Sequence, residues 1–178
     1  MTKEITCCFT GHRVLPADQT ELLEKLIQQI LVLREKKGVT RFVAGGALGF
    51  DTLAAKAVLH LRKEDPSLTL HLVLPCKDQA SRWNVKAVTE YQRILSQADS
   101  VTCLYDSYRP GCMQERNRRM ADESGYCIAY LIKNSGGTKY TVDYCRKTGV
   151  EVLNLGESQE QSAAQRRFED YFGEKHLW

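Results

Sequence analysis

The segment around residues 41–58 carries residue types suited to binding phosphate. A β-branched and aromatic run, Arg41–Ala44, precedes three glycines, and apolar residues recur at helical spacing from Asp51 onward. This pattern predicts a strand that is followed by a glycine turn and then by a helix. Backbone N–H groups at a helix N-terminus attract anions, and glycine lets a ligand approach closely. Asp51, in the first turn, is placed to accept a hydrogen bond from a ribose hydroxyl. The expected ligand-binding residues here are Gly45, Gly46, Ala47, Gly49 and Asp51.

The alternative is a plain tight turn in which Asp51 only complements the helix dipole. The segment matches neither G-x-G-x-x-G nor the phosphate loop G-x-x-x-x-G-K-[ST], so the motif alone leaves both interpretations open.

A second group, Gly11, His12 and Arg13, follows an apolar run, Glu4–Thr10, that predicts the first strand. The guanidinium of Arg13 suits a phosphate. The imidazole of His12 suits hydrogen bonding to the same anion, or general acid–base chemistry. The alternative is a solvated, positively charged loop.

A second glycine turn, Ser135-Gly136-Gly137-Thr138, opens another predicted helix. It would add further N–H donors around the same anion. The alternative role of Thr138 is that of an ordinary helix N-cap.

The charged helix at residues 112–124 and the tryptophan at position 83 are the remaining candidates. Glu115 and Arg119 are spaced for a surface ion pair. Arg116 is expected to neutralise ligand charge, and Asn117, a poor helix former, to point at a ligand or a neighbouring loop. Trp83 would stack on a base or pack at the start of a helix.

Strand and helix patterns alternate along most of the chain, which predicts an α/β fold with a mostly parallel sheet of about six strands. In such sheets ligands bind beyond the carboxyl ends of the strands, where all the segments above are expected to lie. The predicted strands are 4–10, 41–44, 68–74 (ended by Pro75), 100–105, 126–132 and 150–155, and the predicted helices are 19–37, 51–65, 83–98, 112–124 and 138–147.

Composition indicates a globular protein of one domain. The 178 residues are 43% hydrophobic and 26% charged, with a net charge of +3, which is too small to indicate nucleic-acid binding by itself. The start of the chain has no secretory pattern and no run is long enough to span a membrane, so a cytoplasmic protein with seven reduced cysteines is expected. There is no C-x-x-C, so no metal site is predicted, and Cys7, Cys8, Cys103 and Cys127 are expected to act as small hydrophobic residues.

Four motifs together resemble the SLOG superfamily of Rossmann-like domains, and within it the YpsA-like branch. They are Thr10-Gly-His-Arg13, Gly45-Gly-Ala-Leu-Gly-Phe-Asp51, Arg116-Asn-Arg118 and Ser135-Gly-Gly-Thr138. The resemblance covers about residues 3–156. It implies a Rossmann-like three-layer domain over residues 1–156, followed by a C-terminal helix or tail at 157–178. It also implies binding of a nucleotide-derived molecule such as ADP-ribose, in a sensing or regulatory role, and pairing of subunits.

Two relatives implied by the resemblance supply alternatives. The cytokinin-activating phosphoribohydrolases carry P-G-G-x-G-T-x-x-E, whereas the stretch from Ser135 to Asp143 lacks the proline, is shorter and places an Asp near the Glu position. A hydrolase would have to use His12, Asp51 or Asp143, since cleavage of an N-glycosidic bond needs a carboxylate near the anomeric carbon. DprA-like proteins bind single-stranded DNA, which here would require a basic groove with Trp83 or a tyrosine as stacking platform. The sequence favours ligand binding over catalysis and implies no cofactor.

Overall fold

The computed structural model describes residues 2–157, which form one six-stranded sheet with helices on both faces. All five strand pairings are parallel, in the order β4-β3-β2-β1-β5-β6. The strands are β1 (Thr6–Gly11), β2 (Arg41–Ala44), β3 (Thr69–Cys76), β4 (Ser100–Tyr105), β5 (Tyr126–Tyr130) and β6 (Glu151–Asn154), and the helices are α1 (Thr20–Lys37), α2 (Phe50–Leu61), α3 (Val85–Gln97), α4 (Cys112–Asp122) and α5 (Gly137–Lys147).

This architecture confirms the predicted α/β, Rossmann-like fold, and the element bounds agree to within a few residues. The end of β3 differs, because the strand runs through Pro75 to Cys76, which pairs with Tyr105. Thr69 donates its N–H toward β2. Pro75, six residues on, faces the same side, but the pairing with β2 has already ended at Leu72, so the missing N–H breaks no ladder bond.

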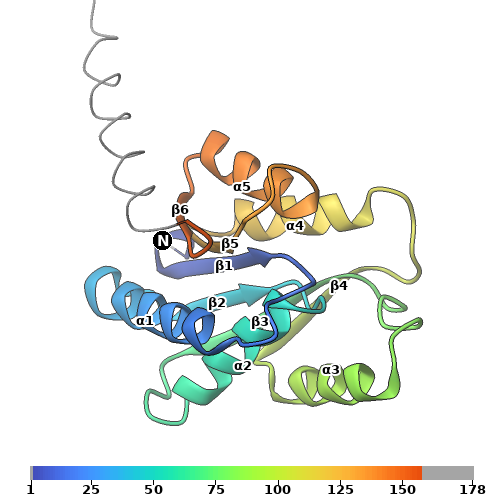
Figure 1. The fold of residues 1–178 in the computed structure, drawn as a ribbon, viewed down its shortest axis with the longest axis horizontal. Coiled ribbons are helices and arrows are strands. Elements are labelled where there is room, and N and C mark those ends of the chain that lie inside the picture. Colours follow the sequence, from blue (N-terminus) through green and yellow to red (C-terminus); the bar gives the residue numbers. More distant parts are fainter. Residues whose placement is uncertain (1, 158–178) are drawn as a thin grey trace, which may run out of the picture.

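The fold has three layers, as Figure 1 shows, and an apolar core lies on each face of the sheet. Helices α1, α2 and α3 cover one face of the sheet, where Phe9 packs against Phe42 and Phe50. Helices α4 and α5 cover the other face over a smaller core of aliphatic and cysteine side chains. Side chains that alternate along the buried strands therefore enter different cores, as Cys7 and Cys8 do.

The strand order reverses at β1. The region between the loop after β1 (residues 12–19) and the loop after β5 (residues 131–136) is here called the crevice. After β1 the chain builds β2, β3 and β4 outward on one side, then crosses back through α4 to place β5 on the other side. The loop after β1 leads to α1 on one face, and the loop after β5 leads to α5 on the opposite face. Ligands of open α/β sheets bind where the strand order reverses in this way.

Two sequence-based expectations concern the ends of the chain and the membrane. The predicted C-terminal helix or tail lies outside the described residues, apart from Glu157. Within residues 2–157, no helix has the length and apolar character needed to cross a membrane.

Candidate functional site

His12 joins the two loops that border the crevice. Its Nε2 accepts a hydrogen bond of 3.0 Å from the backbone N–H of Ile132, and its carbonyl accepts one from the N–H of Phe50 at 3.1 Å. Because Nε2 is an acceptor, the imidazole is neutral and carries its proton on Nδ1. Partial burial, together with the nearby Lys133 cation, lowers the pKa of His12 and so favours this neutral form. His12 therefore offers one N–H donor, from Nδ1.

The first glycine turn is filled by protein groups. The buried carboxylate of Asp51 accepts hydrogen bonds from the N–H groups of Gly45, at 3.1 Å, and Ala47, at 3.3 Å. A Cβ added to Gly45 would overlap the Arg116 guanidinium, and one added to Gly49 would overlap the backbone of Arg13. Glycine is needed at both positions because neighbouring groups already occupy the space beside the backbone.

Arg116 and Asn117 connect the first glycine turn to the second. Arg116 Nη1 donates to the carbonyl of Gly45, and its Nε donates to Asn117 Oδ1 at 2.7 Å. Asn117 Nδ2 donates to Thr141 Oγ1 at 2.9 Å, and that hydroxyl donates to the carbonyl of Gly137 at 2.9 Å. The sequence predicts that Asn117 points at a ligand or a neighbouring loop, and its amide instead contacts the side chains of Arg116 and of Thr141 within α5.

The first turn holds opposite charges close together. Burial raises the pKa of Asp51, while the nearby Arg116 cation and the two loop N–H groups oppose that rise. Burial likewise lowers the pKa of Arg116, while Asp51 opposes the fall. Arg13 is close enough to act on both groups, and its own side chain is exposed. Two cations around one carboxylate leave a positive balance at the crevice.

The second glycine turn is open. Ser135, Gly136 and Gly137 are exposed, and a Cβ added to either glycine would meet no atom within 4 Å. Helix α5 begins at Gly137, so its first N–H groups have no partner inside the helix. The N-cap is Gly136, with φ of 91°, and not Thr138, which is buried in the first turn. The N-cap role considered for Thr138 is therefore wrong, because a positive φ at the cap favours glycine.

Gln79 and Trp83 support the first turn from the side of α3. Gln79 Nε2 donates to the carbonyl of Gly46 and to the Tyr91 hydroxyl, both at 3.2 Å. The partly buried Trp83 ring packs edge-on against Tyr91, with 5.3 Å between centroids. Packing at the start of a helix, one of the two roles considered for Trp83, is thus what these contacts show.

A pocket of about 400 Å³ adjoins the crevice at Arg13 and Gly49. Leu15, Leu48 and Leu53 give it apolar walls. Its polar rim includes charged and amide side chains at Gln19, Lys56, Asn84, Lys86 and Glu90. The predicted site residues are thus divided, since only Arg13 and Gly49 line this pocket, while the second glycine turn lies across the crevice.

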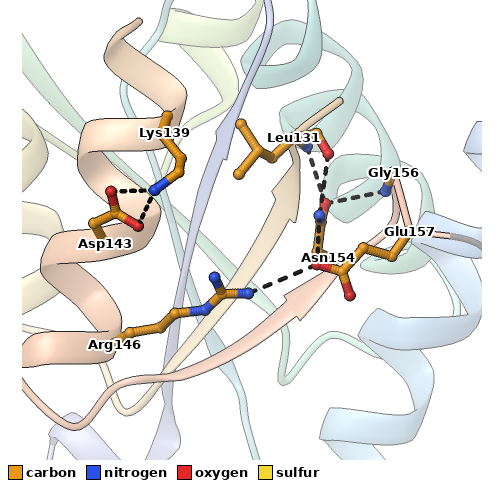
Figure 2. A network of polar contacts seen from close by, with 7 residues as sticks. All are labelled: Leu131, Lys139, Asp143, Arg146, Asn154, Gly156 and Glu157. Atoms are coloured by element: carbon orange, nitrogen blue, oxygen red, sulfur yellow. Dashed lines mark hydrogen bonds and ion pairs between the residues drawn. The ribbon is translucent and has the colours of Figure 1, made fainter. Parts of the chain in front are cut away.

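Figure 2 shows two further sets of polar contacts, one at Asp143 and one at the loop after β5. Lys139 binds the exposed Asp143 carboxylate one helical turn away. The Asn154 side chain pairs with both the N–H and the carbonyl of Leu131, at 2.9 and 3.0 Å. This anchors the backbone just before Ile132, the residue that binds His12.

Sequence reasoning missed the groups that orient the predicted residues. Thr141 and the backbone of Ile132 complete the contacts of Asn117 and His12, and neither carries a recognisable motif. Thr141 has one weak signal, a threonine inside a helix four residues after a glycine turn, where its hydroxyl can bind the preceding turn.

Comparison with known proteins places this chain in context. The YpsA family, described as the YspA SLOG family, matches residues 11–152. The uncharacterized SPbeta prophage-derived protein YoqJ of Bacillus subtilis is 31% identical over 140 residues, which cover 72% of this chain and 82% of YoqJ. A UPF0398 protein of Brevibacillus brevis is 28% identical over 122 residues, covering 67% of this chain and 65% of that protein, just under two thirds of its length. Among solved structures, DNA processing protein A from Helicobacter pylori superimposes with a TM-score of 0.64 at 17% sequence identity. The superposition covers 89% of this chain and 68% of that protein, and at this identity it shows a similarity of fold alone.

Proposed function

The chain belongs to the YspA SLOG family, and we propose that it binds a phosphorylated nucleotide derivative in the crevice between β1 and β5 without cleaving it. The observation that carries the proposal is the open N-terminus of α5, at the end of the loop that His12 contacts. Unpaired N–H groups and a helix dipole are a ready binding site for phosphate. Binding without cleavage fits a sensor or regulatory protein.

The phosphate in this proposal is held by three kinds of donor. The N–H groups at Gly137 and Thr138 open α5, and the neutral His12 ring contributes Nδ1–H. The exposed guanidinium of Arg13 supplies a positive charge with a forked donor geometry. Ser135 and Gly136 shape the mouth of the turn, where the absence of nearby atoms leaves room for phosphate oxygens.

The nucleoside part is assigned to the adjoining pocket, which shares Arg13 with the crevice. A volume of about 400 Å³ is in the range of small-molecule sites. Apolar walls from three leucines suit a base, and the polar rim suits ribose hydroxyls.

Asp51 takes a different role in this proposal from the ribose contact expected from sequence. Its carboxylate is buried and already accepts two hydrogen bonds from its own loop. We assign it, with Arg116, to holding the first glycine turn in place beneath the ligand.

The same contacts favour binding over N-glycosidic cleavage. Among the three acid–base candidates, His12 has Nε2 engaged, Asp51 is buried within its loop, and Asp143 is paired with Lys139. A glycosidase needs a carboxylate that reaches the anomeric carbon.

The test is a thermal-shift screen against ADP-ribose, NAD, AMP and cyclic nucleotides, followed by product analysis of any hit. A ligand at 100 times its Kd adds about 2.7 kcal/mol to the free energy of unfolding. Recovery of the intact nucleotide supports the proposal, whereas recovery of free base and sugar phosphate replaces it with the hydrolase.

Arg13→Ala is the matching variant, because Arg13 is exposed and lies at both halves of the site. It should weaken binding about tenfold or more, in line with about 1.5–3 kcal/mol for a hydrogen bond to a charged group, while leaving the melting temperature without ligand unchanged. Arg119→Ala, which removes an exposed cation paired with Glu123, is the control. Equal affinities for the two variants would refute the assignment of Arg13.

Single-stranded DNA is the second candidate, favoured by the exposed cations of Arg13 and Lys133 at the crevice and by the fold shared with the Helicobacter DNA-binding protein. Its signature would be oligonucleotide binding that weakens steeply with salt, because phosphate neutralisation releases counterions. Such binding, with no nucleotide hit, would favour it over the first proposal.

A further inference from the structure

Three buried cysteines from three different elements meet on the α4 and α5 side of the sheet. Cys8 in β1 pairs in register with Cys127 in β5, and Cys145 comes from α5, which lies over both strands. Their sulfur atoms all lie within 4.8 Å of one another, and each residue is fully buried. This cluster, here called the thiol cluster, is separate from the crevice, which lies at the carboxyl ends of the strands.

The surroundings of the thiol cluster are apolar. Its core contains Val43, Val73, Ala129 and Val142, together with the thioether side chain of Met120. The three cysteines are free thiols. The site thus offers soft sulfur donors in a setting that excludes water.

We propose that the thiol cluster binds one Cu(I) ion. Soft thiolate ligands favour Cu(I), zinc and iron–sulfur clusters. Cu(I), unlike zinc, is satisfied by two or three such ligands. With metal–sulfur bonds of about 2.3 Å, three sulfurs around one ion stand about 4 Å apart. The separations here reach at most 4.8 Å, so small side-chain rotations would close the site.

Zinc fits this donor set less well. Structural zinc sites use four ligands, commonly cysteine and histidine. Within residues 2–157, the group of potential ligands at this place consists of the three cysteines alone. Burial also denies zinc the water that completes its coordination in open sites.

The chain contains a matched control for the site. Cys7 is adjacent to Cys8, equally buried, and belongs to the core on the opposite face of the sheet. The Cys7 thiol contacts the Cys8 carbonyl at 3.4 Å, but its sulfur is not one of the three in the thiol cluster. Cys7→Ala therefore removes a buried thiol of the same kind and leaves all three cluster sulfurs in place.

The experiment loads reduced protein with Cu(I) under anaerobic conditions, both in the native state and during refolding, because the folded chain buries all three thiols. Competition with a coloured Cu(I) chelator measures affinity and stoichiometry. The wild-type chain and Cys7→Ala should each bind one ion. Cys145→Ala should bind at least about 100-fold more weakly, because it removes a direct ligand, and loss of a supporting outer-shell group already costs up to that factor. Equal affinity of Cys145→Ala and wild type would overturn the proposal.

X-ray absorption on the loaded wild-type protein keeps the test independent of variant folding. A shell of two or three sulfur atoms and no lighter neighbour supports the site. Oxygen or nitrogen atoms around the copper would overturn the proposal, as would a protein that retains zinc in preference to copper. A mass lower by two hydrogens with no bound copper would also overturn it, because that mass indicates a disulfide.

Discussion

The two glycine turns of this domain look alike in sequence and differ in structure. In the turn after β2, protein groups fill the space beside the backbone, since Asp51 binds the loop N–H groups and Arg116 binds the carbonyl of Gly45. In the turn before α5, Gly136 and Gly137 face open space. A glycine-rich turn at the carboxyl edge of a sheet is therefore not by itself a ligand site. The closed turn serves as a rigid support, and the open turn has the free donors.

The largest expected effect on stability comes from removing the Asp51 carboxylate from the closed turn. Asp51→Ala removes the acceptor for two loop N–H groups and leaves the Arg116 cation buried without its counter-charge. Loss of one partner of a buried charge pair costs about 3–5 kcal/mol of unfolding free energy. Urea unfolding measures the change, with Asp143→Ala as control, because that exposed carboxylate pairs only across one helical turn and should matter by less than about 0.5 kcal/mol. Similar losses for the two variants would contradict the distinction.

A matched pair of glycine substitutions tests the comparison directly. Gly45→Ala places a Cβ onto the Arg116 guanidinium and should cost about 1–3 kcal/mol by overpacking. Gly137→Ala meets no atom within 4 Å and should change stability by less than about 0.5 kcal/mol. Nucleotide binding should show the reverse order. Gly137→Ala should weaken it more than Gly45→Ala does, because the new methyl group at position 137 narrows the open turn. If both variants unfold at the same urea concentration, the two turns are equivalent and the comparison fails.

A smaller effect should come from uncoupling the two turns. Asn117→Ala removes the link from Arg116 to Thr141 and should cost about 1 kcal/mol, the usual net value of a hydrogen bond. A double-mutant cycle with Thr141→Val should give a coupling energy of at least about 0.5 kcal/mol, as expected for residues in one network. Strict additivity of the two changes would show that the bridge carries no energy.

Much of this architecture was predictable from local patterns. Strand and helix periodicity predicted the parallel α/β fold. Because parallel strands end at one edge of the sheet, it also predicted that Gly11, Gly45 and Ser135 lie at that edge, where β1, β2 and β5 end. Sequence could not tell which turn is open, because one of the groups that fill the first turn, Arg116, lies 71 positions away from Gly45. The meeting of Cys8, Cys127 and Cys145 was hidden for the same reason, since strand order, not spacing, brings them together.

The smallest expected effect is a pH dependence at the contact between His12 and the loop that leads to the open turn. The folded state lowers the pKa of His12 below its usual 6.5, mainly through burial. Between the lowered value and 6.5 the unfolded chain binds more protons, so the stabilising contribution is full above pH 6.5 and is lost as pH falls through the lowered pKa. His12→Gln keeps an acceptor for the Ile132 N–H but does not titrate, so between pH 7 and 5 it should lose less stability than the wild type. The His71 ring, whose pKa burial also lowers, is present in both proteins and cancels in the difference. Urea unfolding at the two pH values measures this difference, and parallel losses would show that the neutral His12 contact does not hold the two loops together.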